Sequence, residues 1–146
     1  MDYRSYDKTY YIRLDKGDEI IKSIIDVCKK NDIQSAIFSG IGGCSRAEIQ
    51  TFIASEGRFE TNTVEGMLEL VSLNGSVTRN DEGEYYHHTH AMFAYKNGQQ
   101  HAVSGGHIKS VEVLYTAEIE LRPVTGGTIK RKTDPETGTG FWSFEE

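Results

Sequence analysis

The sequence predicts an α/β protein of the α+β kind, in which a mainly antiparallel β-sheet packs against one principal α-helix. Only one segment spaces its apolar residues with the period of a helix, whereas most other segments alternate apolar and polar residues as strands do. The 146 residues include 15 glycines and only two prolines, which suits a fold with many tight turns. A chain of this length is expected to form a single domain with one core.

The expected helix follows a turn at residues 15–18, whose acidic residues favour a helix N-terminus. Lys29, Lys30 and Asn31 suit its C-terminal end. One apolar stripe recurs at positions i, i+1, i+4, i+5 and i+8, and it comprises Ile20, Ile21, Ile24, Ile25 and Cys28. The stripe predicts that one face of this helix covers the core.

The remaining elements are expected to be strands. Their β-branched and aromatic content predicts strands at residues 9–14, 36–38, 47–54, 59–64, 67–77, 85–95, 100–104 and 110–121. The glycine-rich segment 39–43 lacks the lysine of a phosphate-binding loop, and no helix follows it. We therefore expect a tight crossing between strands at this segment.

The net charge and the number of cysteines exclude some classes of protein. Lys and Arg number 16 against 22 Asp and Glu, and the formal net charge of −6 argues against a general binder of polyanions such as nucleic acid. Cys28 and Cys44 are too few for a disulfide framework, and we expect both to be core residues. The sequence shows no secretory leader and no apolar run near ~18 residues, so we expect a cytoplasmic protein with no membrane partner.

The strongest chemical signal is a set of three histidines. If the Asn-Gly pair at 97–98 forms a two-residue type I′ turn, His88 lies opposite His107 and His90 lies opposite Gly105. Strand side chains alternate between faces, and opposed Cβ atoms lie about 4.5–5.5 Å apart, so the three imidazoles should converge on one face. A bulge at residues 105–106 would shift this register by one residue. His87 and His101 are expected at the surface, apart from the group.

Three neutral imidazoles at this reach suit a divalent transition metal, and zinc is the identity we expect. Three protein ligands leave one coordination position open for water, a carboxylate or a ligand. The alternative interpretation is a set of half-buried histidines that hydrogen-bond to backbone or water. Tyr86 is a secondary candidate for a general acid or base, or for a residue that supports the histidines, because it shares the face of His88. Glu69 is open to three roles: an edge residue, an interface residue, or a carboxylate that hydrogen-bonds the histidines.

Five segments together resemble one family. Its motifs are similar to residues 38–47 (FSGIGGCSRA), residues 65–75 (EGMLELVSLNG), His88-Thr89-His90, Gly105-Gly106-His107 and Thr116-Ala117-Glu118. Their order and spacing resemble the plants-and-prokaryotes-conserved (PPC) domain, the module attached to AT-hooks in plant nuclear proteins. The resemblance spans residues 10–121.

The resemblance implies a PPC-like fold, a homotrimer, and His88, His90 and His107 as metal ligands. It also implies DNA as a partner. The sequence contains no Arg-Gly-Arg-Pro hook, and residues 67–68 are Met-Leu where plant members carry Arg-Phe. Both departures, with the acidic charge, weigh against direct DNA recognition.

The chain divides into a single PPC-like domain at residues 1–125 and a tail at residues 126–146. Three aromatic residues among residues 141–144 predict that the tail packs on the domain or on a neighbouring subunit. The basic run at residues 130–132 is interpreted as a solvated face.

Three hypotheses for function follow. The first is a trimeric, non-enzymatic regulatory or assembly module of the DNA-binding type with a three-histidine metal site. The alternative is a metal-dependent enzyme or small-molecule sensor that uses the open coordination position. The third is a structural oligomer whose metal is incidental.

Overall fold

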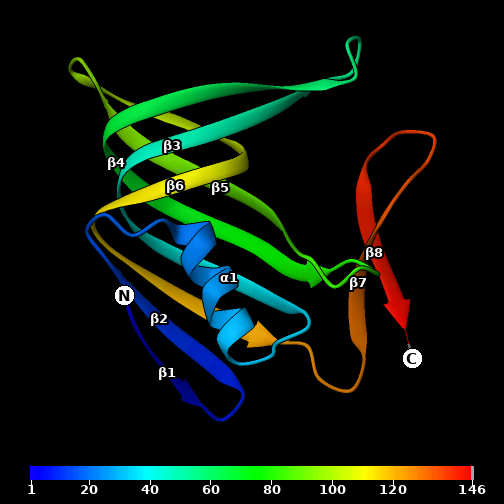
Figure 1. Cartoon of the computed structure of the whole chain (residues 1–146). Helices are drawn as coiled ribbons and strands as arrows, with labels where there is room; N and C mark the ends of the chain where they lie inside the picture. The colour runs from blue at the N-terminus through cyan, green and yellow to red at the C-terminus, as the bar shows by residue number, and fades with distance from the viewer. Residues whose placement is uncertain (146) are drawn as a thin grey trace.

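The computed structural model describes residues 1–145 as one eight-stranded sheet with one α-helix (Figure 1). The elements in chain order are β1 (Asp2–Tyr6), β2 (Thr9–Asp15), α1 (Ile20–Lys30), β3 (Ala36–Ile53), β4 (Arg58–Arg79), β5 (Tyr85–Asn97), β6 (Gln100–Pro123), β7 (Thr128–Thr133) and β8 (Gly140–Glu145). Strand pairing is antiparallel except for one parallel bridge between β4 and β7. The mainly antiparallel sheet with one helix is therefore confirmed.

Four strands close into a ring, because β3 pairs with β4 and β6, and β5 pairs with the same two strands. The core fills the inside of this ring and the space under α1. Its largest fully buried side chains include Phe93, Leu14, Ile24, Leu73 and Ile108. Side chains that alternate with these residues point away from the core, and they form what we call the outer face of the sheet.

The helix begins at Ile20, the first residue of the predicted apolar stripe, and Glu19 caps it. The Glu19 carboxylate accepts hydrogen bonds from the backbone N–H groups of Ile21 and Lys22. It also accepts one from Val111 N at 2.9 Å, which fastens the start of α1 to β6. The apolar stripe is confirmed except at Ile25, which is half-buried, while Val27 is fully buried.

Three strands are longer than the sequence predicts. Residues 36–38 and 47–54 belong to the single strand β3, residues 59–64 and 67–77 belong to β4, and residues 100–104 and 110–121 belong to β6. β-Bulges explain the difference, because the register shifts within β3 between Gly40 and Gly42 and between Cys44 and Arg46. A bulge bends a strand without ending its ladder, so glycines taken as strand ends lie inside continuous strands. β1, β7 and β8 were not predicted.

The glycine-rich segment is a close crossing of strands, as expected. A Cβ on Gly42 would lie 2.6 Å from Thr116 O and 2.7 Å from the Cα of Ala117, both on β6. Only glycine allows β3 and β6 to approach this closely.

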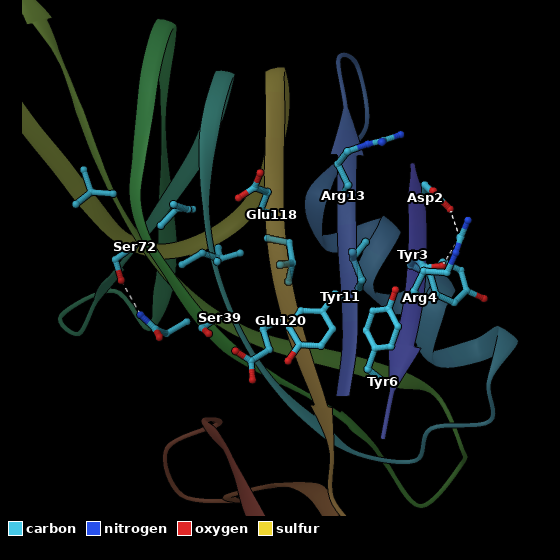
Figure 2. Close-up of a pocket in the computed structure, with 17 residues that line it drawn as sticks. Asp2, Tyr3, Arg4, Tyr6, Tyr11, Arg13, Ser39, Ser72, Glu118 and Glu120 are labelled. Atoms are coloured by element: carbon cyan, nitrogen blue, oxygen red, sulfur yellow. Dashed lines mark hydrogen bonds and ion pairs between the residues drawn. The ribbon is translucent and has the colours of Figure 1, made fainter. Parts of the chain in front are cut away.

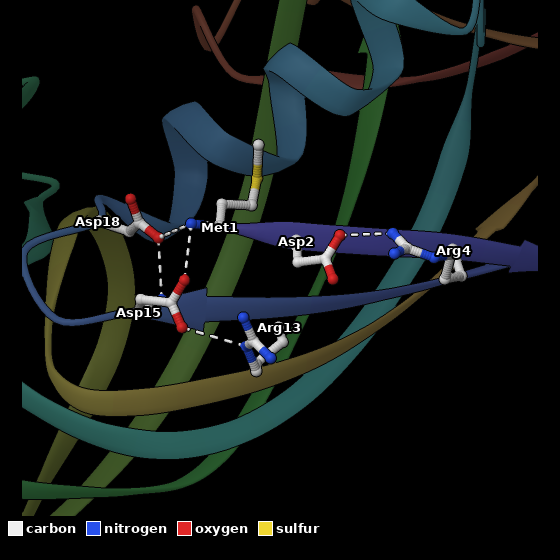
Figure 3. Close-up of polar contacts among 6 residues, drawn as sticks. All are labelled: Met1, Asp2, Arg4, Arg13, Asp15 and Asp18. Atoms are coloured by element: carbon white, nitrogen blue, oxygen red, sulfur yellow. Dashed lines mark hydrogen bonds and ion pairs between the residues drawn. The ribbon is translucent and has the colours of Figure 1, made fainter.

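Charged contacts connect β1 and β2 to the turn before α1 (Figure 3). Arg13 Nε donates to Asp15 Oδ1 at 3.1 Å, and Asp15 N donates to Asp18 Oδ2 at 2.9 Å. The amino group of Met1 lies 2.9 Å from both carboxylates. Its hydrogen bond lowers the pKa of Asp15, whereas the pKa of Asp18 is lowered first by the hydrogen bond from the Asp15 backbone and then by the amino group. Such exposed ion pairs contribute little stability, so these contacts chiefly fix the path of the chain. Within residues 1–145, no helix combines the length and apolar character needed to cross a membrane.

Substitution of Gly42 tests the crossing. We expect Gly42→Ala to lower the free energy of unfolding by about 1–3 kcal/mol, because the added methyl group meets backbone that cannot yield. Gly43→Ala is the matched control, since its nearest neighbour is the exposed side chain of Tyr115 at 3.2 Å, which can move aside. Denaturant unfolding of both variants makes the comparison. Equal stability of the two variants would contradict the crossing.

Candidate metal centre

The β5–β6 hairpin brings two histidines directly opposite each other. Asn97 pairs with Gln100, so the turn consists of Gly98 and Gln99, and His90 pairs with His107. The expected pairing of His88 with His107 is therefore wrong. Gly98 has a φ of +63°, as at the first central position of a type II′ turn, and this moves the tip one residue along the chain.

The corrected register keeps all three histidines on one face. Each residue of β5 changes its partner by two positions, which is one full period of side-chain alternation. His88 then lies diagonally across from His107 on the outer face, within the reach of long side chains. No register shift interrupts the pairing from His90–His107 to the turn, so Gly105 and Gly106 create no bulge in it.

The three rings lie in mutual contact. Ring centroids are separated by 5.2 Å for His88–His90, 5.3 Å for His88–His107 and 5.5 Å for His90–His107. One ring nitrogen from each residue lies within 4.8 Å of the other two. The structure thus brings together all three histidines that the sequence analysis selected.

The ring of Phe59 packs against the ring of His107. The two rings stack with centroids 5.3 Å apart and planes inclined by 26°, and Phe52 packs on Phe59 at 5.2 Å. Both phenylalanines come from the β3–β4 hairpin, far from the histidines in sequence. No local pattern indicated this contact, because it depends on how long strands curve.

Partial burial favours the neutral form of two of these imidazoles, those of His88 and His107. It lowers the pKa of His88 and His107 below the usual histidine value, and the neighbouring histidines lower it further. The charge of Arg131 also acts in this direction on both. Neutral imidazole is the form that binds a metal, so the environment of His88 and His107 favours coordination by these two rings.

Of the two secondary candidates, Glu69 lies apart from the three rings, and the hydroxyl of Tyr86 bonds to another residue. Glu69 pairs with Ala94, four residues along β5 from His90, which places it about 13 Å away at the rise of a strand. Tyr86 lies two residues before His88 on the same face, but its hydroxyl donates to Glu84 at 3.2 Å. The structure does not bring Glu69 to the histidines.

The other two histidines, His87 and His101, differ in how far they are buried. His101 is exposed beside the turn, as expected. His87 was also expected at the surface, but it is half-buried on the opposite side of β5, with Nδ1 3.0 Å from Thr89 Oγ1. Burial there lowers the pKa of His87 to about 4.

Neither cysteine is suited to catalysis. Cys28 and Cys44 are buried, and burial raises the pKa of each thiol to about 12. The reactive thiolate is therefore absent at neutral pH, which agrees with core roles.

Shallow grooves extend from the centre across the outer face. One of about 750 Å³ runs across β1, β2, β6, β3 and β4 and is bordered by Tyr6, Tyr11 and Arg13 (Figure 2). Ser72 and Asn74 also line it, and they continue into a second groove beside His90. The histidines thus lie at the end of a continuous recessed surface.

The fold and site define a class of protein: a one-helix antiparallel sheet with a histidine trio on its outer face. The chain belongs to the Plants and Prokaryotes Conserved (PCC, or PPC) domain family, which matches residues 1–125.

Solved structures agree with this assignment. A PPC protein from Pyrococcus horikoshii is 32% identical with a TM-score of 0.83, over 99% of this chain and 96% of that chain. A metal-containing protein from Archaeoglobus fulgidus is 27% identical with a TM-score of 0.82, over 98% and 99%. A protein named as a putative DNA-binding protein from Bacteroides thetaiotaomicron has a TM-score of 0.88 over 99% and 98%, and at 21% identity it shows the fold alone. A comparison with curated proteins finds no match.

Proposed function

We propose that this chain is a non-enzymatic, metal-binding module of the PPC family, in which His88, His90 and His107 hold a divalent transition metal, with zinc as its identity. The observation that carries the proposal is the approach of three ring nitrogens to within 4.8 Å of one another. The name of the metal-containing relative from Archaeoglobus fulgidus supports it.

The spacing of the three histidine nitrogens suits a zinc ion. Nitrogen ligands of a tetrahedral zinc ion at ~2.0–2.1 Å lie roughly 3.4 Å apart, so small ring rotations bring the three nitrogens to that spacing. Three histidines leave one position for an exchangeable ligand, to which a bound zinc ion supplies Lewis acidity.

Ligand binding suits the site better than catalysis. An enzyme would need a general acid or base near the open position. Glu69 lies about 13 Å along the sheet from His90. Tyr86 is already hydrogen-bonded to Glu84. We therefore place a regulatory or sensory role above the alternative of a metal-dependent enzyme.

Removal of one histidine tests the metal centre. We expect His107→Ala to weaken zinc binding by more than about 100-fold, because loss of a group that merely hydrogen-bonds a ligand already costs about 10–100-fold. His101→Ala is the matched control, since it removes an exposed imidazole from the same strand. Zinc titration by calorimetry, on protein purified without a histidine tag, measures both. Unchanged zinc affinity in His107→Ala would rule out the site.

We further propose that the module is a homotrimer assembled through its outer face. Apolar side chains remain exposed there, including Val103 at 62% and Tyr115 at 65%, with Ile41, Val71 and Met92 around the grooves. Such a patch is costly to leave in water, and the family resemblance supports a second and third copy as its cover.

A charge placed in this patch tests the assembly. We expect the native mass to be three times the 16.4 kDa of one chain. Val103→Lys should shift the protein toward monomer, because it buries an unpaired charge at the interface. Gln99→Lys, at the exposed turn of the same hairpin, should leave the trimer intact. Native mass spectrometry that finds monomer for the unmodified chain would refute the trimer.

Direct binding of duplex DNA is not part of the proposal. The two relatives named as DNA-binding proteins are 21% and 23% identical, and the net charge of −6 opposes phosphate binding. We expect no retention on duplex DNA even at ~50 mM salt, where electrostatic binding is strong. Binding that weakens steeply with added salt would restore DNA as a partner.

A further inference from the structure

The C-terminal hairpin of β7 and β8 lies beyond the family match at residues 1–125, and it meets the sheet at the end of β4 (Figure 1). Lys130 forms the parallel bridge to Arg79 at the end of β4, and Ile129 N donates to Ser35 Oγ at 3.3 Å. The hairpin is thus fixed at the end of β4, the strand whose Ser76 pairs with His88.

Trp142 of β8 forms a wall of the histidine site. Its Nε1 donates to Ser76 Oγ at 3.4 Å, and Ser76 is the β4 residue paired with His88. Trp142, Ile37, His88 and His90 together line a cavity of about 340 Å³. One side of this cavity is apolar and the other carries imidazole rings.

Arg131 lies across the hairpin from Trp142, so both side chains project from the same face of it. Arg131 is half-buried, and within residues 1–144 no carboxylate pairs with its guanidinium. Arg131 also lines a groove together with Tyr86, which lies two residues before His88 on the same face of β5. Arg131 therefore lies beside Trp142 and Tyr86, at the edge of the histidine site.

The positive charges of a bound metal and of Arg131 favour binding of an anion at this site. Neutral imidazoles leave the full charge of a divalent metal uncompensated, and Arg131 adds another positive charge nearby. A carboxylate satisfies both, since guanidinium binds it through paired hydrogen bonds and zinc accepts its oxygen as a ligand. The apolar wall of Trp142 and Ile37 suits the organic part of such a molecule.

We infer that the hairpin and the histidines form one binding site for a small organic carboxylate, which Arg131 holds by its charged end and Trp142 covers. This inference rests on the proposed metal centre and assigns the chemical class of its ligand.

Benzoate binding to the cobalt-loaded chain tests the inference. Cobalt(II) replaces zinc and reports changes at its fourth ligand through its visible spectrum. We expect benzoate to change this spectrum saturably, and Arg131→Gln to weaken benzoate binding by at least about tenfold, because hydrogen bonds between charged groups are among the strong ones. Gly140→Ala should act in the same direction with no loss of charge, since its methyl group would occupy the place of the guanidinium that packs on Gly140.

Lys132→Gln is the matched control, because it removes the same charge from an exposed position on the opposite face of β7. It should leave benzoate affinity unchanged, and all three variants should take up cobalt as the unmodified chain does. Cobalt uptake with equal benzoate affinity in Arg131→Gln would overturn this inference alone, as would an equal loss in Lys132→Gln. Failure of the unmodified chain to bind cobalt would overturn the metal centre together with it.

Discussion

The pairing of His90 with His107 across the β5–β6 hairpin is the constraint on which the rest of the site depends. A strand side chain has only two faces to choose from, so a slip of one residue would turn His107 toward the core and leave two histidines outside. Ile108, the next residue, is fully buried, which makes such a slip expensive. The hydrophobic core therefore fixes the geometry of a polar site on the opposite face.

The sequence predicts secondary structure correctly where a local pattern of residues determines it. The spacing of Ile20, Ile24 and Cys28 identified the helix, because a single face of it is buried. The strand ends were harder to predict. β3 continues through Gly40 and Gly42 because bulges and close contacts with β6 maintain pairing that glycine alone would weaken. These contacts join residues far apart in the chain, so no window of sequence contains them.

The histidine site also combines features that a local pattern determines with features that depend on contacts distant in sequence. The three histidines could be selected from the sequence because the error in the turn changed each pairing by an even number of residues, which preserves the face. Phe59 and Trp142 could not, since they reach the histidines through the curvature of β4 and the docking of a separate hairpin. Local alternation predicts which residues share a strand face, whereas the walls around them depend on tertiary packing.

X-ray absorption spectroscopy at the zinc edge, on the zinc-loaded chain, tests the central claim most directly. The account predicts the multiple-scattering pattern of three imidazoles with nitrogen at about 2.0 Å and one further light ligand. A sulfur ligand at about 2.3 Å, or a shell of oxygen with no imidazole signature, would contradict it, because the histidine trio would then not be the place where the metal binds.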